Sequence, residues 1–564
     1  MEYILKREST ASGIGFFGCS PAEPMNPPQA LAHIKAHPND EFMRRYVLRM
    51  LETMEPQEFA ALVEQAVQEG PDAFRALVCE ASLVHAKFNG FTARFTPFGL
   101  NQLAAYSPLP LLRAEAEADR ALQRQWASVL QANIIGHEEF PRAIAAGLSA
   151  PCAPFRTVQG LTPDNLGEFA PASSGDSLPV LPDAGTTAAT ARQRLDELDV
   201  FHDVEHRHEA SLSPVALLRE WEMDIDIASG TLDYNLSGIQ TSYGKGLELD
   251  TARASLYMEI VERVSSFASV ENGCIADRLA DLSLVLASRE ELTERGEIPL
   301  PTVLPAPDGT TDGADGKVKI HWLAGERADG ARVMVPAQFT FLFCNLDEPA
   351  LAEGLDSTGL ASGNIMEQAR LSGLYEVLER DAEAVGVYDS ARCFRLTSSD
   401  PAIGALLADY ADKGIAVVAQ ELTTDLGVPA YKVFVQSRDG ELAKGTGCSL
   451  SSRSALLSAL LETMYPYPNG EPSAQAPADL PVRSLESLPE YGTGHPMTDL
   501  HLLEKLLQSN GFAPVYVDLT RDDLRLPVCR AFVPGLAPAA DFSAYSRMHP
   551  RQWNAVQEFM KTVS

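Results

Sequence analysis

Two stretches of the sequence repeat one pattern, Ser-x3-Glu-x2-Glu-Arg, and this repeat limits the possible folds more than any other feature. It occurs in ASLYMEIVER (residues 254–263) and in LSGLYEVLER (residues 371–380). At 3.6 residues per turn, the specified residues of each copy share an arc of about 100°, and apolar residues gather on the opposite arc. Each stretch is therefore predicted to be a helix with a buried apolar back and two carboxylates on one face.

The two predicted faces carry Ser255, Glu259, Glu262 and Arg263 in the first copy, and Ser372, Glu376, Glu379 and Arg380 in the second. If the faces meet, the carboxylates converge in one pocket, which is stable only with cations between them. Hard oxygen ligands indicate magnesium or calcium. The alternative is an ordinary solvated face, because Glu followed by Arg four residues later also stabilises a helix.

Composition narrows the class of protein. The 564 residues are 45% hydrophobic and 22% charged, which predicts a globular chain of two or three domains. The net charge of −32 argues against nucleic acid or an anionic membrane as partner and favours a basic peptide or protein. The eight cysteines include no CxxC motif, so neither a zinc site nor a disulfide framework is indicated. No signal peptide or membrane span is recognised, so we expect a cytoplasmic protein.

The chain divides into predicted regions at 1–140, 141–198, 199–545 and 546–564. Short amphipathic patterns separated by prolines predict a helical N-terminal domain over 1–140, and a composition rich in Pro, Gly and Ser predicts a linker over 141–198. Mixed strand and helix patterns then predict an α+β domain over 199–545, followed by a tail. We expect the N-terminal helices to bind a substrate or partner, and structural cover for the next domain is the alternative.

Other familiar sites receive little support. His202, His206 and His208 lie close together, but they lack the flanking cysteines or spacing of a zinc site, so we interpret them as ordinary surface histidines. The chain contains neither a P-loop nor a Gly-x-Gly-x-x-Gly motif after a strand. If a nucleotide binds, it does not bind in either of these common ways.

Several motifs, in order, resemble those of YcaO-domain proteins. The run SYGKGLELDTARASLYMEIVERVSSF (242–267) is similar to the first family signature, and STGLASGNIMEQARLSGLYEVLERDA (357–382) is similar to the second. HWLAG before Val335-Pro336, KGTGCSLSSRSALLSALLET (444–463) and CRAFVPGL (529–536) extend the resemblance. It covers the chain from about Ser211 to Leu536.

The resemblance implies an ATP-binding fold in which magnesium is held against the phosphates and a backbone amide of a peptide or protein is activated by phosphorylation. It implies that Glu259, Glu262, Glu376 and Glu379 are magnesium ligands. Nucleotide contacts or ligand-orienting roles would fall to Lys245, Ser255, Arg263, Ser372, Arg380 and Arg530. Glu462, from a third helix, and Arg530 would be the catalytic residues. An amide needs such activation because its oxygen is a poor leaving group until it is phosphorylated.

The sequence departs from the family pattern at two places. The third helix often carries Glu-x2-Gln, whereas this chain has Glu462 followed by Tyr465 and a proline, and its C-terminal EFMKTVS is not the proline-rich tail of azoline-forming members. Two functions therefore stay open. One is an ATP-dependent enzyme that installs an azoline, thioamide or similar change, with a partner supplying substrate or sulfur. The other is a non-catalytic ATP-binding accessory to another modifying enzyme, such as a ribosomal-protein methylthiotransferase. The substrate, the modification and the oligomeric state, including a homodimer, are left open.

Overall fold

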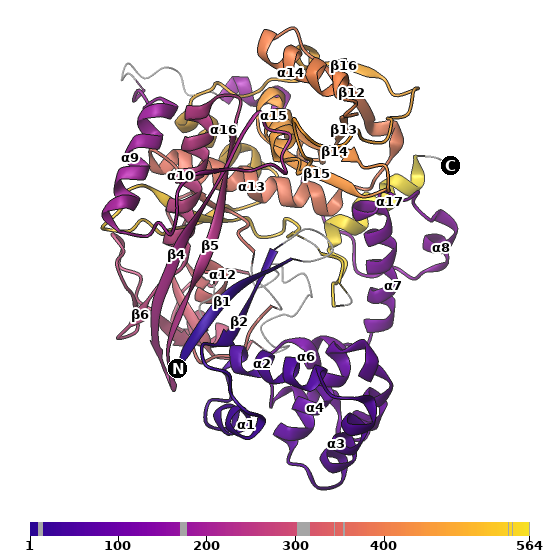
Figure 1. The fold of residues 1–564 in the computed structure, drawn as a ribbon, viewed down its shortest axis with the longest axis vertical. Helices are drawn as coiled ribbons and strands as arrows, with labels where there is room; N and C mark the ends of the chain where they lie inside the picture. Colours follow the sequence, from indigo (N-terminus) through magenta and orange to yellow (C-terminus); the bar gives the residue numbers. More distant parts are fainter. Residues whose placement is uncertain are drawn as a thin grey trace.

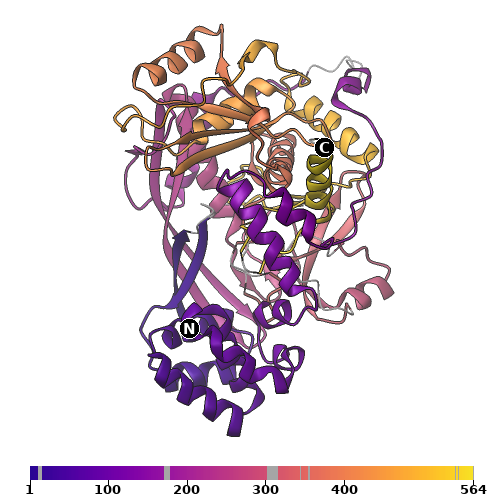
Figure 2. The ribbon, with the colours of Figure 1, turned by 90° about the vertical axis from the view of Figure 1, so that its right-hand side faces the viewer.

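The chain folds into a helical N-terminal lobe attached to a larger body of sheets and helices. The computed structural model describes residues 1–9, 15–169, 178–301, 316–342, 345–352, 356–539, 541–543 and 545–562. Within these residues the strands form three sheets. The lobe lies at one end of the molecule in Figure 1, and the turned view in Figure 2 shows it projecting from the body. This mixed architecture confirms the predicted α+β class with a mainly helical N-terminal part.

The first sheet is built around a long hairpin. Its strands β4 (Val215–Ser229) and β5 (Leu232–Gly246) pair antiparallel over their whole length, with Gly230 in the left-handed region (φ 58°) at the turn. Burial alternates along the second half of β4, as expected for a strand with one face on the core. The short strands that extend this sheet are β3 (His206–Arg207), β6 (Val270–Glu271) and β7 (Cys274–Ile275).

The N-terminal segment joins this same sheet, which the sequence did not predict. Strand β1 (Glu2–Ser9) pairs in parallel with β5, and β2 (Gly15–Pro21) pairs with β1. Tyr3 is fully buried, and its ring packs edge-on against Phe42 at 5.4 Å and Tyr234 at 5.8 Å between ring centroids. The prediction of one helical domain over 1–140 is therefore corrected at its start, because a pair of short strands is stable only as part of a larger sheet.

The other two sheets carry the helices that form the site. The second sheet contains β8 (Val285–Ala287), β9 (Ile320–Arg327), β10 (Arg332–Pro336), β11 (Leu360–Ser362), β17 (Val515–Asp518) and β18 (Val528–Phe532). The third contains β12 (Cys393–Thr397), β13 (Val418–Glu421), β14 (Ala430–Gln436), β15 (Leu442–Cys448) and β16 (Val482–Ser484). Helix α10 (Leu249–Ser266) packs on β5, α13 (Met366–Val385) on β11, β18 and β15, and α15 (Ser452–Glu462) on β14 and β15. Each sheet thus supplies a support for one or more of these helices.

The N-terminal lobe shares its core with the first sheet. Its elements are α1 (Pro27–Ala36), α2 (Glu41–Glu52), α3 (Pro56–Glu69), α4 (Asp72–Val84), η1 (Ala86–Phe98), α5 (Leu100–Ala104) and α6 (Leu111–Glu115). The next elements, α7 (Arg120–Leu130), η2 (Gln131–Ile135) and α8 (Arg142–Gly147), leave the lobe and share a separate apolar cluster with the C-terminal segment. Buried residues of α2 to α4 belong to one apolar cluster with those of β4, β5 and α10. The lobe is therefore packed directly onto the body.

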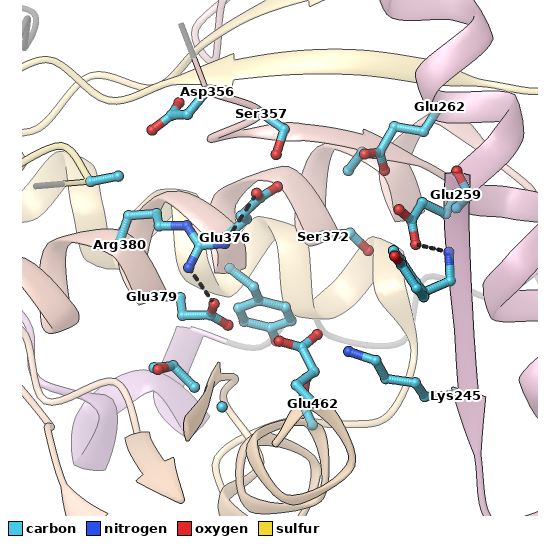
Figure 3. A pocket seen from close by; sticks show the side chains of 18 of the residues that line it. Lys245, Glu259, Glu262, Asp356, Ser357, Ser372, Glu376, Glu379, Arg380 and Glu462 are labelled. Carbon is cyan, nitrogen blue, oxygen red and sulfur yellow. Dashed lines mark hydrogen bonds and ion pairs between the residues drawn. The ribbon is translucent and has the colours of Figure 1, made fainter. Parts of the chain in front are cut away.

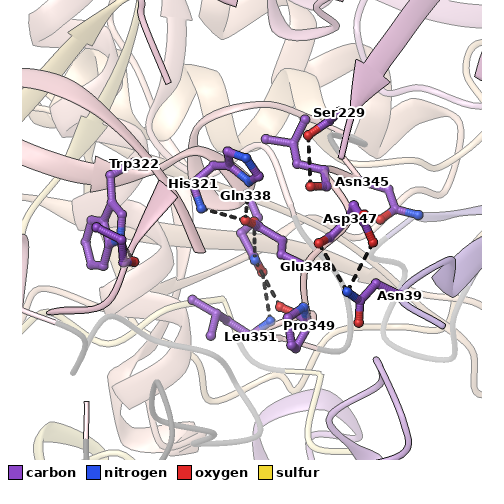
Figure 4. A network of polar contacts seen from close by, with 12 residues as sticks. Asn39, Ser229, His321, Trp322, Gln338, Asn345, Asp347, Glu348, Pro349 and Leu351 are labelled. Carbon is purple, nitrogen blue, oxygen red and sulfur yellow. Dashed lines mark hydrogen bonds and ion pairs between the residues drawn. The ribbon is translucent and has the colours of Figure 1, made fainter. Parts of the chain in front are cut away.

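A polar network also joins the lobe to the body (Figure 4). Asn39 Nδ2 donates to Asp347 Oδ1 at 3.1 Å across this junction. Beside it, Glu348 is 5% exposed and accepts hydrogen bonds from Gln338 Nε2 at 2.6 Å and from the backbone N–H of His321 at 2.5 Å. Because a buried carboxylate is costly without partners, these bonds fix the segment 345–352 against β9 and α12 (Ala337–Thr340).

The predicted linker, 141–198, is largely packed against the body. It contains α8, η3 (Pro163–Phe169) and α9 (Ala184–Glu197), with residues 170–177 outside the described part. Leu166 is 1% exposed, and Ala191 and Leu195 of α9 are fully buried against α10. This differs from our expectation of a loosely packed segment: Ala191 and Leu195 lie one helical turn apart and form an apolar stripe that the composition of the whole segment concealed.

The predicted tail forms a docked helix. Arg551, near the start of α17 (Pro550–Lys561), makes two hydrogen bonds of 2.8 Å to Asp381 of α13, and both side chains are buried. The remaining helices are α11 (Arg289–Glu294), η4 (Ser390–Arg392), α14 (Pro401–Asp412), η5 (Leu485–Ser487) and α16 (Pro496–Ser509). In the described part of the chain, none of the helices has the length and apolar character that a bilayer crossing requires.

Candidate functional site

A cavity of about 860 Å³ lies between α10, α13 and α15. Its walls include residues of β5, β14 and β15, together with Ile134 and Ile135 from the N-terminal segment and Phe542 from the segment before α17. This volume falls within the usual range of ligand sites. The cavity therefore draws on distant parts of the chain, including a segment that we expected to lie outside the nucleotide domain.

Helix α10 presents its predicted polar face to the cavity. Its opposite face is apolar, and Leu256, Ile260 and Val261 are fully buried. On the cavity side, Arg263 lies 3.9 Å from Glu259 and 3.3 Å from Glu262. The contact of α10 with β5 requires Gly244, because a Cβ there would overlap the carbonyl oxygen of Ala252. This close approach explains why a glycine precedes Lys245 in the first motif.

Helix α13 presents the second copy in the same way. The guanidinium of Arg380 lies 3.8 Å from Glu376, 3.2 Å from Glu379 and 2.8 Å from Glu383. Figure 3 shows Glu259 and Glu262 on α10 facing the Glu376 and Glu379 side of α13 across the cavity. The convergence of the two repeated faces, which the spacing suggested, is thus present in the structure.

The cavity brings together most of the predicted site residues. Those that line it are Lys245, Ser255, Glu259, Glu262, Arg263, Ser372, Glu376, Glu379, Arg380 and Glu462. Glu462 is the last residue of α15 and projects into the cavity beside Lys245 (Figure 3). Arg530 is different. It lies on β18, is 5% exposed, and is not among the described residues that line the cavity.

Arg530 is buried behind the cavity wall. Its Nη2 donates to the carbonyl oxygen of Asp356 at 2.8 Å, and Asp356 itself lines the cavity. Its Nε and Nη1 are buried without a hydrogen-bond partner among the described residues. Its positive charge lowers the pKa of both Glu262 and Glu376 relative to what burial alone would give. Arg530 thus acts electrostatically on both motifs.

The carboxylates of the cavity repel one another. Burial, followed among the raising effects by the charge of Glu376, raises the pKa of Glu262 to about 8, although Arg263 opposes the rise. Burial likewise raises the pKa of Glu376 to about 7 and that of Glu379 well above its usual range. Carboxylic acids with such values hold protons at neutral pH unless a cation replaces them. The arrangement therefore favours cation binding.

The residues fit magnesium only when another oxygen donor takes part. Among the described residues, no three His, Cys, Asp or Glu side chains converge closely enough to hold a metal ion. Arg263 and Arg380 instead bridge the carboxylates of their own helices. Magnesium requires about six oxygen ligands and commonly takes some from substrate phosphates. Carboxylates on opposite walls, with room between them, suit a metal ion that also binds phosphate oxygens.

Some residues of the cavity were not predicted from the sequence. They are Asp356, Ser357, Glu383, Lys432, Lys444 and Thr446. Glu383 lies one turn beyond Glu379, so the helical period of α13 was enough to find it. The two lysines come from strands whose pairing the sequence does not reveal.

Two other sequence observations are resolved by geometry. The hydroxyl of Tyr465 donates to the carbonyl oxygen of Glu471 at 2.8 Å, and Tyr465 is buried in the core under β14 and β15 rather than lining the cavity. The three histidines do not form one site. His202 and His206 bond separate carboxylates, whereas His208 lines the cavity next to the ring of Tyr243.

A comparison with protein families identifies the chain. The model described as YcaO cyclodehydratase, binding ATP and Mg²⁺, matches residues 243–480 and 463–537, which together span more than half of the sequence. The chain belongs to the YcaO family. The match includes both repeated helices, α15 and β18, and it confirms the resemblance found in the sequence. ATP and Mg²⁺ are the cofactors of the family, in agreement with our prediction.

Two curated relatives match at lower identity. An uncharacterized protein of Methanothermobacter thermautotrophicus is 29% identical over 331 residues, covering 52% of this chain and 80% of the relative. An uncharacterized protein in the tfuA 3′ region of Rhizobium leguminosarum bv. trifolii is 28% identical over 281 residues, covering 46% of this chain and 62% of the relative. The chain thus spans less than two thirds of the second relative.

Solved structures show distant likeness. A heterocyclase in complex with substrate and cofactor is 18% identical, with a TM-score of 0.48 over 64% of this chain and 55% of the other. YcaO from Methanopyrus kandleri, bound with AMPPCP and Mg²⁺, is 19% identical, with a TM-score of 0.43 over 63% of this chain and 91% of the other.

Proposed function

We propose that this protein uses ATP and Mg²⁺ to phosphorylate a backbone amide oxygen of a peptide or protein, so that an azoline, thioamide or similar group can form. One observation carries the proposal: carboxylates from α10, α13 and α15 meet in a single cavity with raised pKa values for Glu262, Glu376 and Glu379. Such a cluster is unfavourable without cations. The proposal explains why the cluster exists.

Each residue type has a distinct role in this proposal. Glu259 and Glu262 on α10, and Glu376 and Glu379 on α13, would hold Mg²⁺. Lys245, Ser255 and Ser372 would contact the nucleotide, and the arginines Arg263 and Arg380 would orient the carboxylates that they already bridge. Bound Mg-ATP would supply the phosphoryl group and the positive charge that stabilises its transfer. Glu462 would act as the catalytic residue, accepting a proton or aligning the amide from the α15 side. Arg530, which we predicted to be catalytic, does not line the cavity and would instead position Asp356 and act through its charge on Glu262 and Glu376.

Nucleotide binding tests the site directly. We expect calorimetry to show Mg-ATP binding that is lost when Mg²⁺ is chelated, and that weakens at least tenfold in Glu259→Gln and in Glu376→Gln. Glu367→Gln is the matched control, because Glu367 lies in the first turn of α13 and does not line the cavity. Parent-like Mg-ATP binding by both cavity variants would contradict the proposed magnesium site.

Catalysis requires a second measurement. We expect peptides incubated with the protein, Mg-ATP and a candidate partner to lose one water or to exchange an oxygen for sulfur, detected by mass spectrometry, and Glu462→Gln to abolish the change. One observation supports the alternative of a non-catalytic, ATP-binding accessory protein: Tyr465 replaces the usual glutamine and turns away from the cavity. Mg-ATP binding without ADP formation, with every peptide and partner tested, would favour that accessory role.

A further inference from the structure

The end of the cavity beside Glu383 has a basic wall that the proposed magnesium site does not use. Lys432 on β14 pairs with Thr446 on β15, and Phe434 pairs with Lys444. Paired residues project from the same face of a sheet, so Lys432, Lys444 and Thr446 share one face. The other face of β15 contacts α15 so closely that a Cβ at Gly445 would overlap the carbonyl oxygen of Ala459. The lysine face is therefore the one directed to the cavity.

This basic wall lies away from the first residues of the α13 motif. Ser372 and Glu383 both line the cavity from α13, and eleven residues of helix span about 16 Å. Thr446 Oγ1 donates to Glu383 Oε1 at 2.6 Å, which places the β15 face at the Glu383 end. The cavity is thus elongated, with Ser372 at one end of the helix face and the lysines at the other.

The nearby carboxylate of Glu383 attracts both lysines but makes a direct ion pair with neither of them. Arg380 and the two lysines keep the pKa of Glu383 low, at about 2, against the effect of burial. The oxygens of Glu383 accept from Thr446 and pair with Arg380 at 2.8 Å, and no ion pair involving Lys432 or Lys444 occurs within the described residues. Lys432 is 1% exposed, and its ammonium makes one hydrogen bond, to the carbonyl oxygen of Ile134 at 3.3 Å. An ammonium group can donate three hydrogen bonds, so this buried charge is left with unused donors.

Apolar and aromatic side chains also lie near the lysines. Ile134 and Ile135 form part of the cavity wall, and the ring of His137 stacks on Tyr388 at 4.3 Å between centroids. Burial and the charges of both lysines lower the pKa of His137 to about 2, so this histidine is neutral. Burial and Lys444 lower the pKa of Lys432 to about 8. An anion bound between the two lysines would stabilise their charges beyond what the single carboxylate of Glu383 provides.

We propose that Lys432, Lys444 and Thr446 form an oxyanion subsite at the Glu383 end of the cavity, which binds a carboxylate or phosphate group of the molecule being modified. The subsite itself does not depend on ATP binding; only the assignment of the anion to the substrate depends on the proposed function. It also gives the N-terminal segment a specific role, because Ile134 both lines the subsite and accepts the hydrogen bond from Lys432.

Anion binding without nucleotide tests the subsite. The probes are inorganic phosphate and acetate, added to metal-free protein and followed by calorimetry and by the rise in Tm that binding to the folded state produces. We expect binding of at least one probe to weaken fivefold or more in Lys444→Met. Lys35→Met, on the exposed surface of α1, is the control and should bind like the parent. Equal binding by the parent and Lys444→Met would overturn the proposal.

Two further arms separate this subsite from the nucleotide site. Lys245→Met should weaken Mg-ATP binding and leave phosphate or acetate binding unchanged. Lys444→Met should weaken phosphate or acetate binding and leave Mg-ATP binding unchanged. Anion binding should persist when Mg²⁺ and a non-hydrolysable ATP analogue saturate the protein; its loss would show that the lysines belong to the nucleotide site and would overturn the proposal. Tighter acetate binding identifies a carboxylate as the occupant, and tighter phosphate binding identifies a phosphate, and both uphold the subsite.

The thermal stability of a Lys432 variant tests whether this buried lysine takes part in anion binding. Lys432→Met replaces a buried ammonium by an apolar side chain of similar length, so we expect its Tm without anion to equal or exceed that of the parent. Its Tm should no longer respond to the bound probe. A parent-like response of Lys432→Met would contradict the role of this lysine.

Discussion

Helices α10 and α13 carry the same pattern on the faces that line the cavity, but different contacts stabilise their opposite faces. The back of α10 is apolar, with Leu256, Ile260 and Val261 fully buried. The back of α13 includes Asp381, a fully buried carboxylate whose two oxygens are bonded by Arg551 of α17. One motif therefore depends on core packing, and the other also depends on a helix near the far end of the sequence. The predicted C-terminal tail is thus structural support for the site without lining it.

The largest expected effect comes from separating Arg551 and Asp381. Arg551→Met leaves a buried carboxylate without its cation, so we expect the free energy of unfolding to fall by about 4 kcal/mol. Urea unfolding measures this loss, and weaker Mg-ATP binding at temperatures where the variant is folded would show that α13 has shifted. The comparison variant is Ile260→Ala on α10. Truncating this buried side chain leaves a void in the core, so we expect the free energy of unfolding to fall by about 3 kcal/mol.

Arg547→Met provides the control for removing an arginine near α17. Arg547 pairs with Asp119 at 2.7 Å, but both side chains are partly exposed, so we expect a loss of at most about 1 kcal/mol. If Arg551→Met cost no more than Arg547→Met, then Asp381 would not depend on α17, and the difference between the two helices would disappear.

We expect a smaller effect of pH on the thermal stability of the metal-free protein. The folded-state pKa values of Glu262 on α10 and Glu376 on α13, about 8 and about 7, lie above the unfolded value near 4.3. The folded state therefore binds more protons, and stability should fall as pH rises from about 5 to 8. We expect Tm to decrease over this interval and Mg²⁺ with ATP to reduce the decrease.

Variants of the two helices sharpen this measurement. Glu262→Gln should reduce the fall in Tm with rising pH more than Glu376→Gln does, because the pKa of Glu262 is the higher of the two. The part that Glu262→Gln removes should also lie at higher pH. A metal-free Tm that rises between pH 5 and 8 in the parent would show that these carboxylates are ionised in the folded protein.

The smallest expected effect concerns Arg530, whose charge acts on both helices. Arg530→Lys keeps a positive charge but loses the planar set of donors, two of which are buried without partners among the described residues. We expect Mg-ATP affinity to fall several-fold with little change in Tm, as measured by calorimetry and thermal unfolding. Arg525→Lys, at an exposed position, is the control. Unchanged affinity in Arg530→Lys would make Arg530 a purely structural partner of Asp356.

The helical period predicted most of the site residues on α10 and α13, whereas the strand residues Lys245 and Arg530 were found only through family motifs. The period of 3.6 residues fixes which side chains of α10 and α13 share a face, so the spacing alone was enough to group Glu259 with Glu262 and Glu376 with Glu379. Lys432 and Lys444 meet because of strand register, which depends on pairing between separate segments. Tyr465 shows a further limit, because α15 ends at Glu462 and a side chain beyond the end of a helix no longer follows the helical period.

The parallel pairing of β1 with β5 has a consequence for how the chain acquires its structure. Glu2 of β1 pairs with Asn235 of β5, so β1 is synthesised before its partner strand. The entire N-terminal lobe separates the two strands in the sequence. The entropy lost in closing a loop grows with its length, and contacts between distant residues slow folding. We therefore expect the lobe helices, whose contacts are local, to collapse first, and the first sheet to be completed late, when β5 reaches the buried ring of Tyr3.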